Sequence, residues 1–325
     1  MKKVAINGTG RIGICAARII GRRMDMEIVA INSTADIDTL LHLIRHDSVH
    51  KGYDAHKIDE ETLRIGNSKT VKILSNRDIA QLDFLDAEAV IECTGKFTAL
   101  HKASAHLKGN IKKVIISAAA ENTPTFVYGV NHTQYQGQDV ISNASCTTNC
   151  LATIALVLHQ NFGIESGLMT TVHSYTNDQN LLDVKHKDIR RARAAGMNMI
   201  PTSTGAAKAI GLVMPELNGK LNGTSIRVPT PDVSIVDLTA NLSKAITKEV
   251  IHNAFEEAQN TYLKDLLFVD HEKCVSSDFI GSSYSAIFVP DQTLVLGNCV
   301  KILAWYDNEM GYSHRLVDMC AYMLD

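Results

Sequence analysis

The sequence predicts an α/β protein with two domains, and three observations support this prediction. The chain has 325 residues, a length that corresponds to about two domains. Its first part alternates short apolar strands with longer amphipathic stretches, which is typical of βαβ units and a mostly parallel sheet. Its second part has the pattern of an α+β layer with a mostly antiparallel sheet.

The first part contains several candidate strands with helical patterns between them. Residues 12–20 have the pattern of a helix that packs on the sheet between the first two strands. Strands that are connected by helices form parallel sheets covered on both faces. The predicted strands are residues 4–6, 28–31, 89–93, 114–116, 126–128 and 140–141.

The character of the sequence changes after residue 145. A helix is predicted to begin at Cys146, because apolar residues recur with helical spacing from Leu151 to Leu158, and Gly163 is placed to end it. The strands predicted after this helix are residues 168–175, 224–228, 233–240, 284–289 and 294–306.

A last amphipathic helix is predicted over residues 313–324. Its apolar pattern alone would allow it to pack on either domain. We assign the C-terminal segment to the first domain. The predicted domains are therefore residues 1–145 joined by the C-terminal helix 309–325, and residues 146–308.

Composition excludes several classes of protein. Hydrophobic residues make up 45% of the chain and charged residues 21%, which excludes intrinsic disorder and collagen-like repeats. The formal charge is -3, so no overall basic field favours nucleic acid or an anionic membrane as a partner. The seven scattered cysteines are interpreted as reduced thiols. With no apolar run near 18 residues and no leader pattern, a cytoplasmic protein is expected.

A glycine-rich loop follows the first predicted strand. Gly8, Gly10 and Gly13 match the spacing G-x-G-x-x-G, with Arg11 and Ile12 between the last two glycines. In such loops the glycines allow a tight turn, the approach of backbone amides to a pyrophosphate, and close packing of helix on strand. The helix N-terminus adds partial positive charge. The spacing alone is weak, but in this βαβ context it predicts a Rossmann-type dinucleotide-binding domain.

The acidic residue that usually completes this pattern is missing. About 20 residues after the loop, at the end of the next strand, the chain has Ser33 and Thr34 rather than a carboxylate. A missing carboxylate removes the repulsion of a 2′-phosphate, and two hydroxyls are present to bind one. Alternatively, Asp36 or Asp38 takes the role of binding the ribose, although both have the pattern of the first turn of the next helix.

Cys146 is the strongest candidate nucleophile. It lies where a strand leads into a helix, and the N-terminus of a helix lowers the pKa of a thiol. His173 follows near the end of a strand and is a candidate base. Most cysteines are buried packing residues, which is the interpretation of Cys15, Cys93, Cys299 and Cys320. A metal site is not expected, because Cys146 and Cys150 have no second pair at zinc spacing.

Several longer strings resemble the phosphorylating glyceraldehyde-3-phosphate dehydrogenase family, in order and over essentially the whole chain. They are SCTTNC at 145–150, HSYTNDQ at 173–179, RRARAA at 190–195, PTSTGAAK at 201–208, RVPTP at 227–231 and WYDNE at 305–309.

The resemblance implies a reaction. Cys146 would attack an aldehyde, a hydride would pass to NAD or NADP, and inorganic phosphate would cleave the resulting thioester to an acyl phosphate. His173 would act first as base and then as acid. The backbone amide of Cys146 would hold the oxyanion, a contribution of about 3 to 4 kcal/mol per donor in other enzymes. The expected reaction is the reversible oxidation of glyceraldehyde 3-phosphate to 1,3-bisphosphoglycerate.

The resemblance also implies the binding residues. Thr176, Asp178 and Arg227 would line the pocket for the phosphate of the substrate. Ser145, Thr147, Thr204, Gly205 and Arg227 would line the pocket for the attacking phosphate. The expected cofactor-binding residues are Gly8, Gly10, Arg11, Ile12, Gly13, Ser33, Thr34, Arg77, Thr94, Gly95, Ser117, Lys185, Asn308 and Tyr312.

Asn308 would fix the nicotinamide carboxamide, with Tyr312 beside it. By the family pattern, the arginine-rich segment at 190–193 belongs to a loop at the cofactor and the subunit interface of a homotetramer, rather than to a nucleic-acid site.

Two departures from the family pattern concern the cofactor. Ser33 replaces a common Asp, and Lys185 replaces a proline that is usual in NAD-specific members. A lost carboxylate and a gained ammonium lead to the hypothesis that NADP is accepted and preferred.

Three alternatives stay open. Erythrose 4-phosphate is an alternative substrate, disfavoured by Thr176 and the Thr204–Gly205 pair. A non-phosphorylating oxidation is disfavoured by the second anion pocket. An interaction protein with vestigial catalysis is disfavoured by the presence of Cys146, His173 and Arg227.

Overall fold

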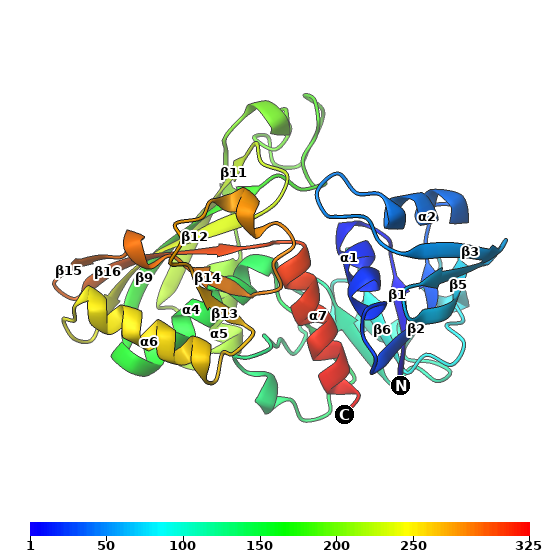
Figure 1. Cartoon of the computed structure of the whole chain (residues 1–325), viewed down its shortest axis with the longest axis horizontal. Helices are drawn as coiled ribbons and strands as arrows, with labels where there is room; N and C mark the ends of the chain where they lie inside the picture. The colour runs from blue at the N-terminus through cyan, green and yellow to red at the C-terminus, as the bar shows by residue number, and fades with distance from the viewer. The chain divides into compact units, whose positions relative to one another are not determined.

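The computed structural model describes residues 1–325, which form two compact units (Figure 1). The first unit contains Met1–Ser145 and Ser313–Asp325, and the second contains Cys146–Tyr312. The break near the C-terminus falls inside the last helix, α7 (Met310–Met323), rather than before residue 309. No helix has the length and apolar character needed to cross a membrane.

The first unit is built on an eight-stranded sheet with the order β3-β4-β5-β2-β1-β6-β7-β8. From β5 to β8 neighbouring strands are parallel, and β3, β4 and β5 form an antiparallel edge. The strands are β1 (Lys2–Asn7), β2 (Met26–Asn32), β3 (Ala55–Asp59), β4 (Thr62–Ile65), β5 (Ser68–Leu74), β6 (Ala89–Glu92), β7 (Lys113–Ile116) and β8 (Val140–Ser142).

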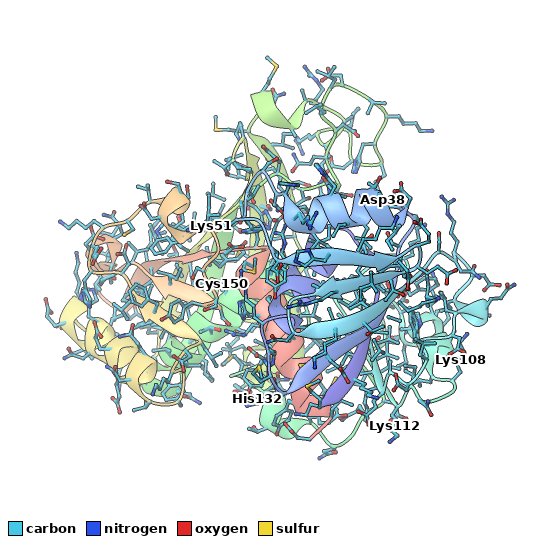
Figure 2. The ribbon with its side chains drawn as sticks, turned by 45° about the vertical axis from the view of Figure 1, so that its right-hand side comes forward. Asp38, Lys51, Lys108, Lys112, His132 and Cys150 are labelled. Atoms are coloured by element: carbon cyan, nitrogen blue, oxygen red, sulfur yellow. The ribbon has the colours of Figure 1, made fainter.

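Three short helices accompany this sheet: α1 (Arg11–Ile20), α2 (Ile37–Arg45) and α3 (Leu100–Ala103). Figure 2 labels Asp38 on α2, Lys108 and Lys112 in the segment before β7, and His132 in a 3-10 turn before β8. The side chain of Asp36 accepts the Thr39 amide at 2.8 Å and so caps α2, as its position in the sequence suggested. The predicted α/β fold with a mostly parallel sheet is confirmed.

Two predictions about the first unit were wrong. Residues 126–128 form no strand, because Asn131 folds back on them: its Oδ1 accepts the Val127 amide at 2.8 Å and its Nδ2 donates to the Thr125 carbonyl at 3.0 Å. The antiparallel strands β3, β4 and β5 were not predicted, since their exposed edge carries mixed polar residues rather than a clear apolar run.

The second unit contains a mixed sheet in which antiparallel pairs predominate, with the order β10-β11-β9-β12-β16-β14-β13 and β15 paired with β16. Only the pairs β11·β9 and β13·β14 are parallel. The strands are β9 (Ile164–Ser174), β10 (Ile200–Ser203), β11 (Leu221–Val228), β12 (Ser234–Leu242), β13 (Leu267–Val269), β14 (Ala286–Phe288), β15 (Leu294–Leu296) and β16 (Cys299–Tyr306). The prediction of a mostly antiparallel sheet is confirmed.

Residues 294–306 were predicted as one strand, but they form the β15–β16 hairpin. Gly297 has φ +63° and lies in the turn between the two strands. Because glycine adopts this left-handed conformation without a steric penalty, the chain reverses there.

Helix α4 (Cys146–Phe162) is the central helix of the second unit. It contacts α5 (Ala206–Val213), α6 (Lys248–Asn260) and the strands β9, β12, β14 and β16. Leu151, Ile154 and Leu158 are completely buried, and Gly163 with φ +69° ends the helix as predicted. A helix packed on all sides is held firmly, and this fixes the position of its first residue, Cys146.

Candidate active site

Cys146 and His173 lie together in the second unit. Cys146 is the first residue of α4, and His173 is the second-last residue of the long strand β9. The Cys146 Sγ atom lies 3.5 Å from His173 Nε2, although the residues are 27 positions apart in the chain. This is hydrogen-bond range for a thiol and the distance expected of a nucleophile and its base.

The surroundings of His173 define its tautomer. Its Nδ1 atom lies 2.7 Å from the Ser174 carbonyl oxygen, which can only accept a hydrogen bond. Arg227 Nη1, which can only donate, lies 2.9 Å from the same nitrogen, but it also donates to the Ser174 carbonyl at 3.1 Å. The shorter contact with the carbonyl oxygen assigns the proton of the neutral ring to Nδ1, which leaves the lone pair on Nε2, facing the thiol. In this state His173 can accept the proton of Cys146.

The pKa shifts describe a neutral pair. Burial lowers the pKa of His173 to about 3, and the positive charge of Arg227 acts in the same direction. Burial raises the pKa of the Cys146 thiol, although the charge of Arg227 and hydrogen bonds at Thr147 oppose this rise. The expectation that the helix N-terminus lowers the pKa of Cys146 was therefore wrong. Desolvation of the thiol raises this pKa by more than the N-terminus of α4 lowers it. A thiol with a raised pKa needs a base to remove its proton, and His173 Nε2 lies 3.5 Å away, close enough to accept it.

Arg227 supplies a positive charge beside this pair. It lies on β11 in register with His173 on β9, and its Nη1 atom donates to the Ser174 carbonyl at 3.1 Å. Burial lowers the pKa of Arg227. No Asp or Glu forms a salt bridge with it, and its Nε is buried without a hydrogen-bond partner. A partly buried guanidinium without a carboxylate partner is suited to bind an anion.

Tyr306, which the sequence analysis did not single out, supports the same centre. Its hydroxyl group lies 2.8 Å from Thr147 Oγ1 and 2.8 Å from Thr171 Oγ1. Its ring meets the His173 imidazole edge-on with centroids 6.0 Å apart. The predicted phosphate residue Thr147 is thus held at the start of α4 by Tyr306. The sequence did contain a signal for Tyr306: like His173, it lies at the end of a strand, where polar side chains reach a site.

The other predicted phosphate residues are distributed over three segments. Thr204 and Gly205 precede α5, where Gly205 is the N-cap and the Thr204 hydroxyl accepts the Ala206 amide at 3.2 Å. Asp178 forms an ion pair with Arg191, and Arg191 Nε donates to Thr202 Oγ1 at 3.0 Å. Thr176 opens the turn after β9, and Ser145 directly precedes α4.

The segment around Asn308 is held by hydroxyl and carboxyl groups. Asn308 Oδ1 accepts hydrogen bonds of 2.7 Å from Ser174 Oγ and from Ser234 Oγ. Asp307 Oδ1 accepts the amides of Glu309 and Met310, and so caps the start of α7. Because Oδ1 of Asn308 is engaged in the second unit, its Nδ2 group is the one suited to a ligand.

Asp232 is buried next to Asp307, and the two are 2% and 1% exposed. Burial raises the pKa of Asp232, and the charges of Asp307 and Glu309 raise it further. Above about pH 4 the unfolded chain ionises Asp232 while the folded chain keeps the proton. The contribution of this group to stability is therefore lost as pH rises.

We expect the variant Asp232→Asn to gain stability relative to the wild type as pH rises. The difference in unfolding free energy should grow by about 1.4 kcal/mol per pH unit between pH 5 and 8. Urea unfolding at each pH measures it. Asp291→Asn, which alters an exposed carboxylate, is the control and should show no such trend. A difference that is constant with pH would contradict the raised pKa.

The first unit contains a cavity of about 390 Å³ at the carboxyl ends of β1, β2, β5 and β6. Ligands of open parallel sheets bind at this edge. Among the predicted cofactor residues, Gly8, Gly10, Thr34, Arg77 and Thr94 line it. The lining contains Arg77 and Lys96 but no Asp or Glu; its other residues are Asn7, Thr9, Asn32, Ala35, Leu43, Asn76, Ile79, Cys93 and Phe97.

The glycine-rich loop has the geometry that its spacing implied. Gly8 has φ +102°, and a Cβ at Gly13 would lie 2.0 Å from the Gly8 carbonyl oxygen. Only glycine fits at either position. The loop therefore leaves room for backbone amides to approach a pyrophosphate, so the residues present fit a dinucleotide.

Other predicted cofactor residues do not line this cavity. Arg11 forms a two-pronged salt bridge with Asp47 at 2.7 and 3.1 Å. Ser33 is 2% exposed, and its hydroxyl lies 2.7 Å from Thr9 Oγ1. The remaining ones outside the lining are Ile12, Gly13, Gly95 and Ser117 in the first unit, and the exposed Lys185 with Asn308 and Tyr312 in the second.

The sequence analysis missed several residues that line the cavity. Two of them follow from the rule that polar residues at the ends of parallel strands face the ligand. Asn7 and Asn32 end β1 and β2, so the position of polar residues at strand ends was a usable signal. Asn76 follows β5, a strand that was not predicted. Asp36 and Asp38, the two carboxylates considered as alternatives for binding the ribose, make other contacts. Asp36 caps α2, and Asp38 forms an ion pair with Lys57 at 3.1 Å.

A Rossmann-type domain and a Cys–His pair beside an unpaired arginine define a class of protein, the dinucleotide-dependent dehydrogenases that use a cysteine. The model of the NAD binding domain of glyceraldehyde 3-phosphate dehydrogenase matches residues 2–100, and that of the C-terminal domain matches residues 145–308. The chain belongs to the glyceraldehyde-3-phosphate dehydrogenase family of oxidoreductases.

Bacterial relatives are similar over the whole length. Glyceraldehyde-3-phosphate dehydrogenase 1 of Bacillus cereus is 51% identical over 329 residues, covering 99% of this chain and 98% of the relative. The enzyme of Geobacillus stearothermophilus is 50% identical over 327 residues, with the same shares covered. Glyceraldehyde-3-phosphate dehydrogenase 2 of Bacillus subtilis (strain 168) is 47% identical, covering 99% of this chain and 96% of the relative.

Proposed function

We propose that the chain catalyses the reversible phosphorylating oxidation of glyceraldehyde 3-phosphate to 1,3-bisphosphoglycerate. The observation that carries this proposal is the partly buried Arg227, which has no carboxylate partner, beside the Cys146–His173 pair. A thiol with a base performs covalent aldehyde chemistry, and an adjacent arginine without a carboxylate binds phosphate. The names of the relatives, which are about half identical over the whole chain, support the same substrate.

In this proposal His173 Nε2 takes the proton of Cys146 as sulfur attacks the aldehyde carbon. The backbone amide at the start of α4 and His173 stabilise the oxyanion of the thiohemiacetal. A bound nicotinamide dinucleotide supplies the hydride acceptor. A phosphate oxygen then attacks the thioester carbonyl, the bond from this carbon to the Cys146 sulfur breaks, and His173 returns its proton to the leaving sulfur.

The two phosphates would be bound by separate groups that share Arg227. Thr176 would bind the substrate phosphate, and Asp178 would line the pocket and hold its partner Arg191 in place, since a carboxylate cannot donate a hydrogen bond to a phosphate. Ser145, Thr147, Thr204 and Gly205 would bind the attacking phosphate at the N-termini of α4 and α5.

Rate measurements with glyceraldehyde 3-phosphate test the function. We expect reduced dinucleotide to form only when phosphate is present, and erythrose 4-phosphate to react at least tenfold more slowly. Turnover that persists without phosphate would favour a non-phosphorylating oxidation. A higher kcat/KM for erythrose 4-phosphate would assign the sister activity instead.

We propose that NADP is preferred over NAD. The cavity in the first unit has two cationic side chains and no carboxylate, so nothing in it repels a 2′-phosphate. Thr34 and Arg77 line it and are the residues that would contact that phosphate. Ser33 acts indirectly, because its hydroxyl already bonds to Thr9 and accepts the Ala35 amide at 3.1 Å. Lys185 would add positive charge at the cofactor of a neighbouring subunit.

We expect Ser33→Asp to lower the ratio of kcat/KM for NADP over NAD by tenfold or more. The new carboxylate would lie next to Thr34, which lines the cavity, and its negative charge would disfavour a 2′-phosphate there. Ser277→Asp, which adds the same charge on the exposed surface of the second unit, should leave the ratio unchanged. A wild-type preference of tenfold or more for NAD would contradict the proposal.

We propose a homotetramer. The segment 180–199 of the second unit exposes several large apolar side chains, which is unusual for a free surface and typical of an interface. Sedimentation of the protein at several concentrations measures the assembly. The exposed side chains are Leu181 (85%), Leu182 (72%), Ile189 (84%), Met197 (82%) and Met199 (75%).

A further inference from the structure

A buried Glu–His pair lies at the edge of the parallel sheet in the first unit. Glu92 is the last residue of β6, and His106 ends the 3-10 turn Ser104–His106. His106 Nε2 lies 2.9 Å from Glu92 Oε2, and the side chains are 0% and 1% exposed. The imidazole contacts the rings of Phe84, which is tilted against it, and Phe97, which meets it edge-on, each with its centroid 5.9 Å away. Neither member of the pair lines the dinucleotide cavity.

Glu92 nevertheless contacts two residues that do line the cavity. The Asn7 Nδ2 group donates to Glu92 Oε2 over 2.6 Å. The backbone amide of Thr94 donates to Glu92 Oε1 over 2.7 Å, and the Thr94 hydroxyl donates to the same oxygen. Together with His106, four donors satisfy both oxygens of a buried carboxylate.

Asn7 is held between the Glu92 carboxyl group and Asn32. Its Nδ2 group donates to Glu92, and its Oδ1 atom faces Asn32. Asn7 Oδ1 then accepts from Asn32 Nδ2 over 2.7 Å. Asn32 Oδ1 in turn accepts the backbone amide of Asn76 over 2.9 Å. Asn32 Nδ2 also donates to the Asn76 carbonyl over 2.8 Å, so the Asn76 backbone orients Asn32 at one end of this network and Glu92 holds Asn7 and Thr94 at the other.

A buried ion pair is poor evidence for stability, because its desolvation cost offsets the attraction. A dry polar network does fix the orientation of the groups that it bonds. Side chains that are already oriented bind a ligand without a further entropy cost. The Glu92–His106 pair has the connections needed for such a role, since its partners line the cavity and it does not.

We propose that Glu92 and His106 form a positioning pair for the dinucleotide: His106 holds the Glu92 carboxyl group, and Glu92 holds Asn7 and Thr94 in place at the cavity. This inference rests on the proposed dinucleotide-dependent function and adds residues that touch neither cofactor nor substrate. The pair acts on the binding of the dinucleotide and leaves the chemistry at Cys146 unaltered.

Two variants of the full-length protein test the pair. Glu92→Gln keeps the shape but replaces one acceptor oxygen with an NH₂ group, so the side chain can no longer accept from both Asn7 and Thr94. His106→Gln keeps the carboxylate but removes the rigid donor. His101→Gln, on the exposed face of α3, is the matched control. Calorimetric titration gives the Kd for NAD and NADP, rate measurements give kcat and KM, and thermal unfolding gives Tm.

We expect Glu92→Gln to raise Kd and KM for the dinucleotide about tenfold, and His106→Gln about threefold, with kcat at saturation within twofold of wild type. A lower Tm with unchanged Kd would show a structural role only and would overturn the proposal. If Glu92→Gln fails to fold, His106→Gln decides by the same criterion. Wild-type protein that binds neither dinucleotide overturns the proposed function itself, whereas equal binding by wild type and variants overturns the positioning pair alone.

Discussion

The variant Cys146→Ser should lose the oxidation of glyceraldehyde 3-phosphate, with kcat reduced about 10⁴-fold or more. A serine hydroxyl at this position keeps its proton far more tightly than a thiol. The base beside it is weak, because burial and the charge of Arg227 lower the pKa of His173 to about 3. Such a base can assist a thiol at 3.5 Å but cannot ionise an alcohol. Initial rates at saturating substrate measure the loss.

Cys150→Ser is the matched control for this variant. Cys150 lies one turn further along α4, is completely buried, and points its Sγ at the Ala304 carbonyl 3.9 Å away (labelled in Figure 2). Its replacement should leave kcat within a few fold. Iodoacetate should inactivate the wild type and Cys150→Ser but find no essential thiol in Cys146→Ser. Substantial turnover by Cys146→Ser would contradict the assigned nucleophile.

The variant His173→Gln should lower kcat by about 10² to 10⁴-fold, the usual contribution of a positioned acid–base group. Because burial raises the pKa of Cys146, most of the thiol is protonated near neutral pH and depends on His173. The deficit of the variant should therefore shrink as pH rises and thiolate forms without a base. Rates of wild type and variant from pH 6 to 9 give the profile.

His271→Gln is the control, since His271 is exposed and pairs with Glu256 far along the chain from the centre. It should retain the rate and the pH profile of the wild type. A deficit of His173→Gln that stays constant from pH 6 to 9 would show that His173 does not act on the thiol proton.

Much of the fold was predictable because its signals are local. The glycine spacing at 8–13 determines a tight turn between β1 and α1, and the apolar periodicity after Cys146 predicts α4 with its end at Gly163. The errors arose where local signals are weak. The polar edge strands β3 to β5 lack an apolar run, and residues 126–128 have one but are bonded by Asn131 instead.

The candidate site was predictable in its residue types but not in its contacts. Arg227 and His173 are 54 residues apart and meet because β9 and β11 are parallel neighbours in register. Tyr306 reaches Thr147 from the last strand of the unit. Ser33, expected to face a ligand, bonds to Thr9 from the glycine-rich loop. Strand order determines such pairs, and a single sequence does not display it.

The sequence by itself thus determined the family, the glycine-rich turn and helix α4, and it supplied Cys146 as the candidate nucleophile, because each depends on residues that are close together along the chain. Only the tertiary structure decided the protonation states and the supporting groups. A thiol at a helix N-terminus was expected to be acidic, yet the packing of α4 desolvates it and raises its pKa. The Glu92–His106 pair likewise depends on the tertiary structure, since its burial and its contacts arise only when distant segments fold against each other.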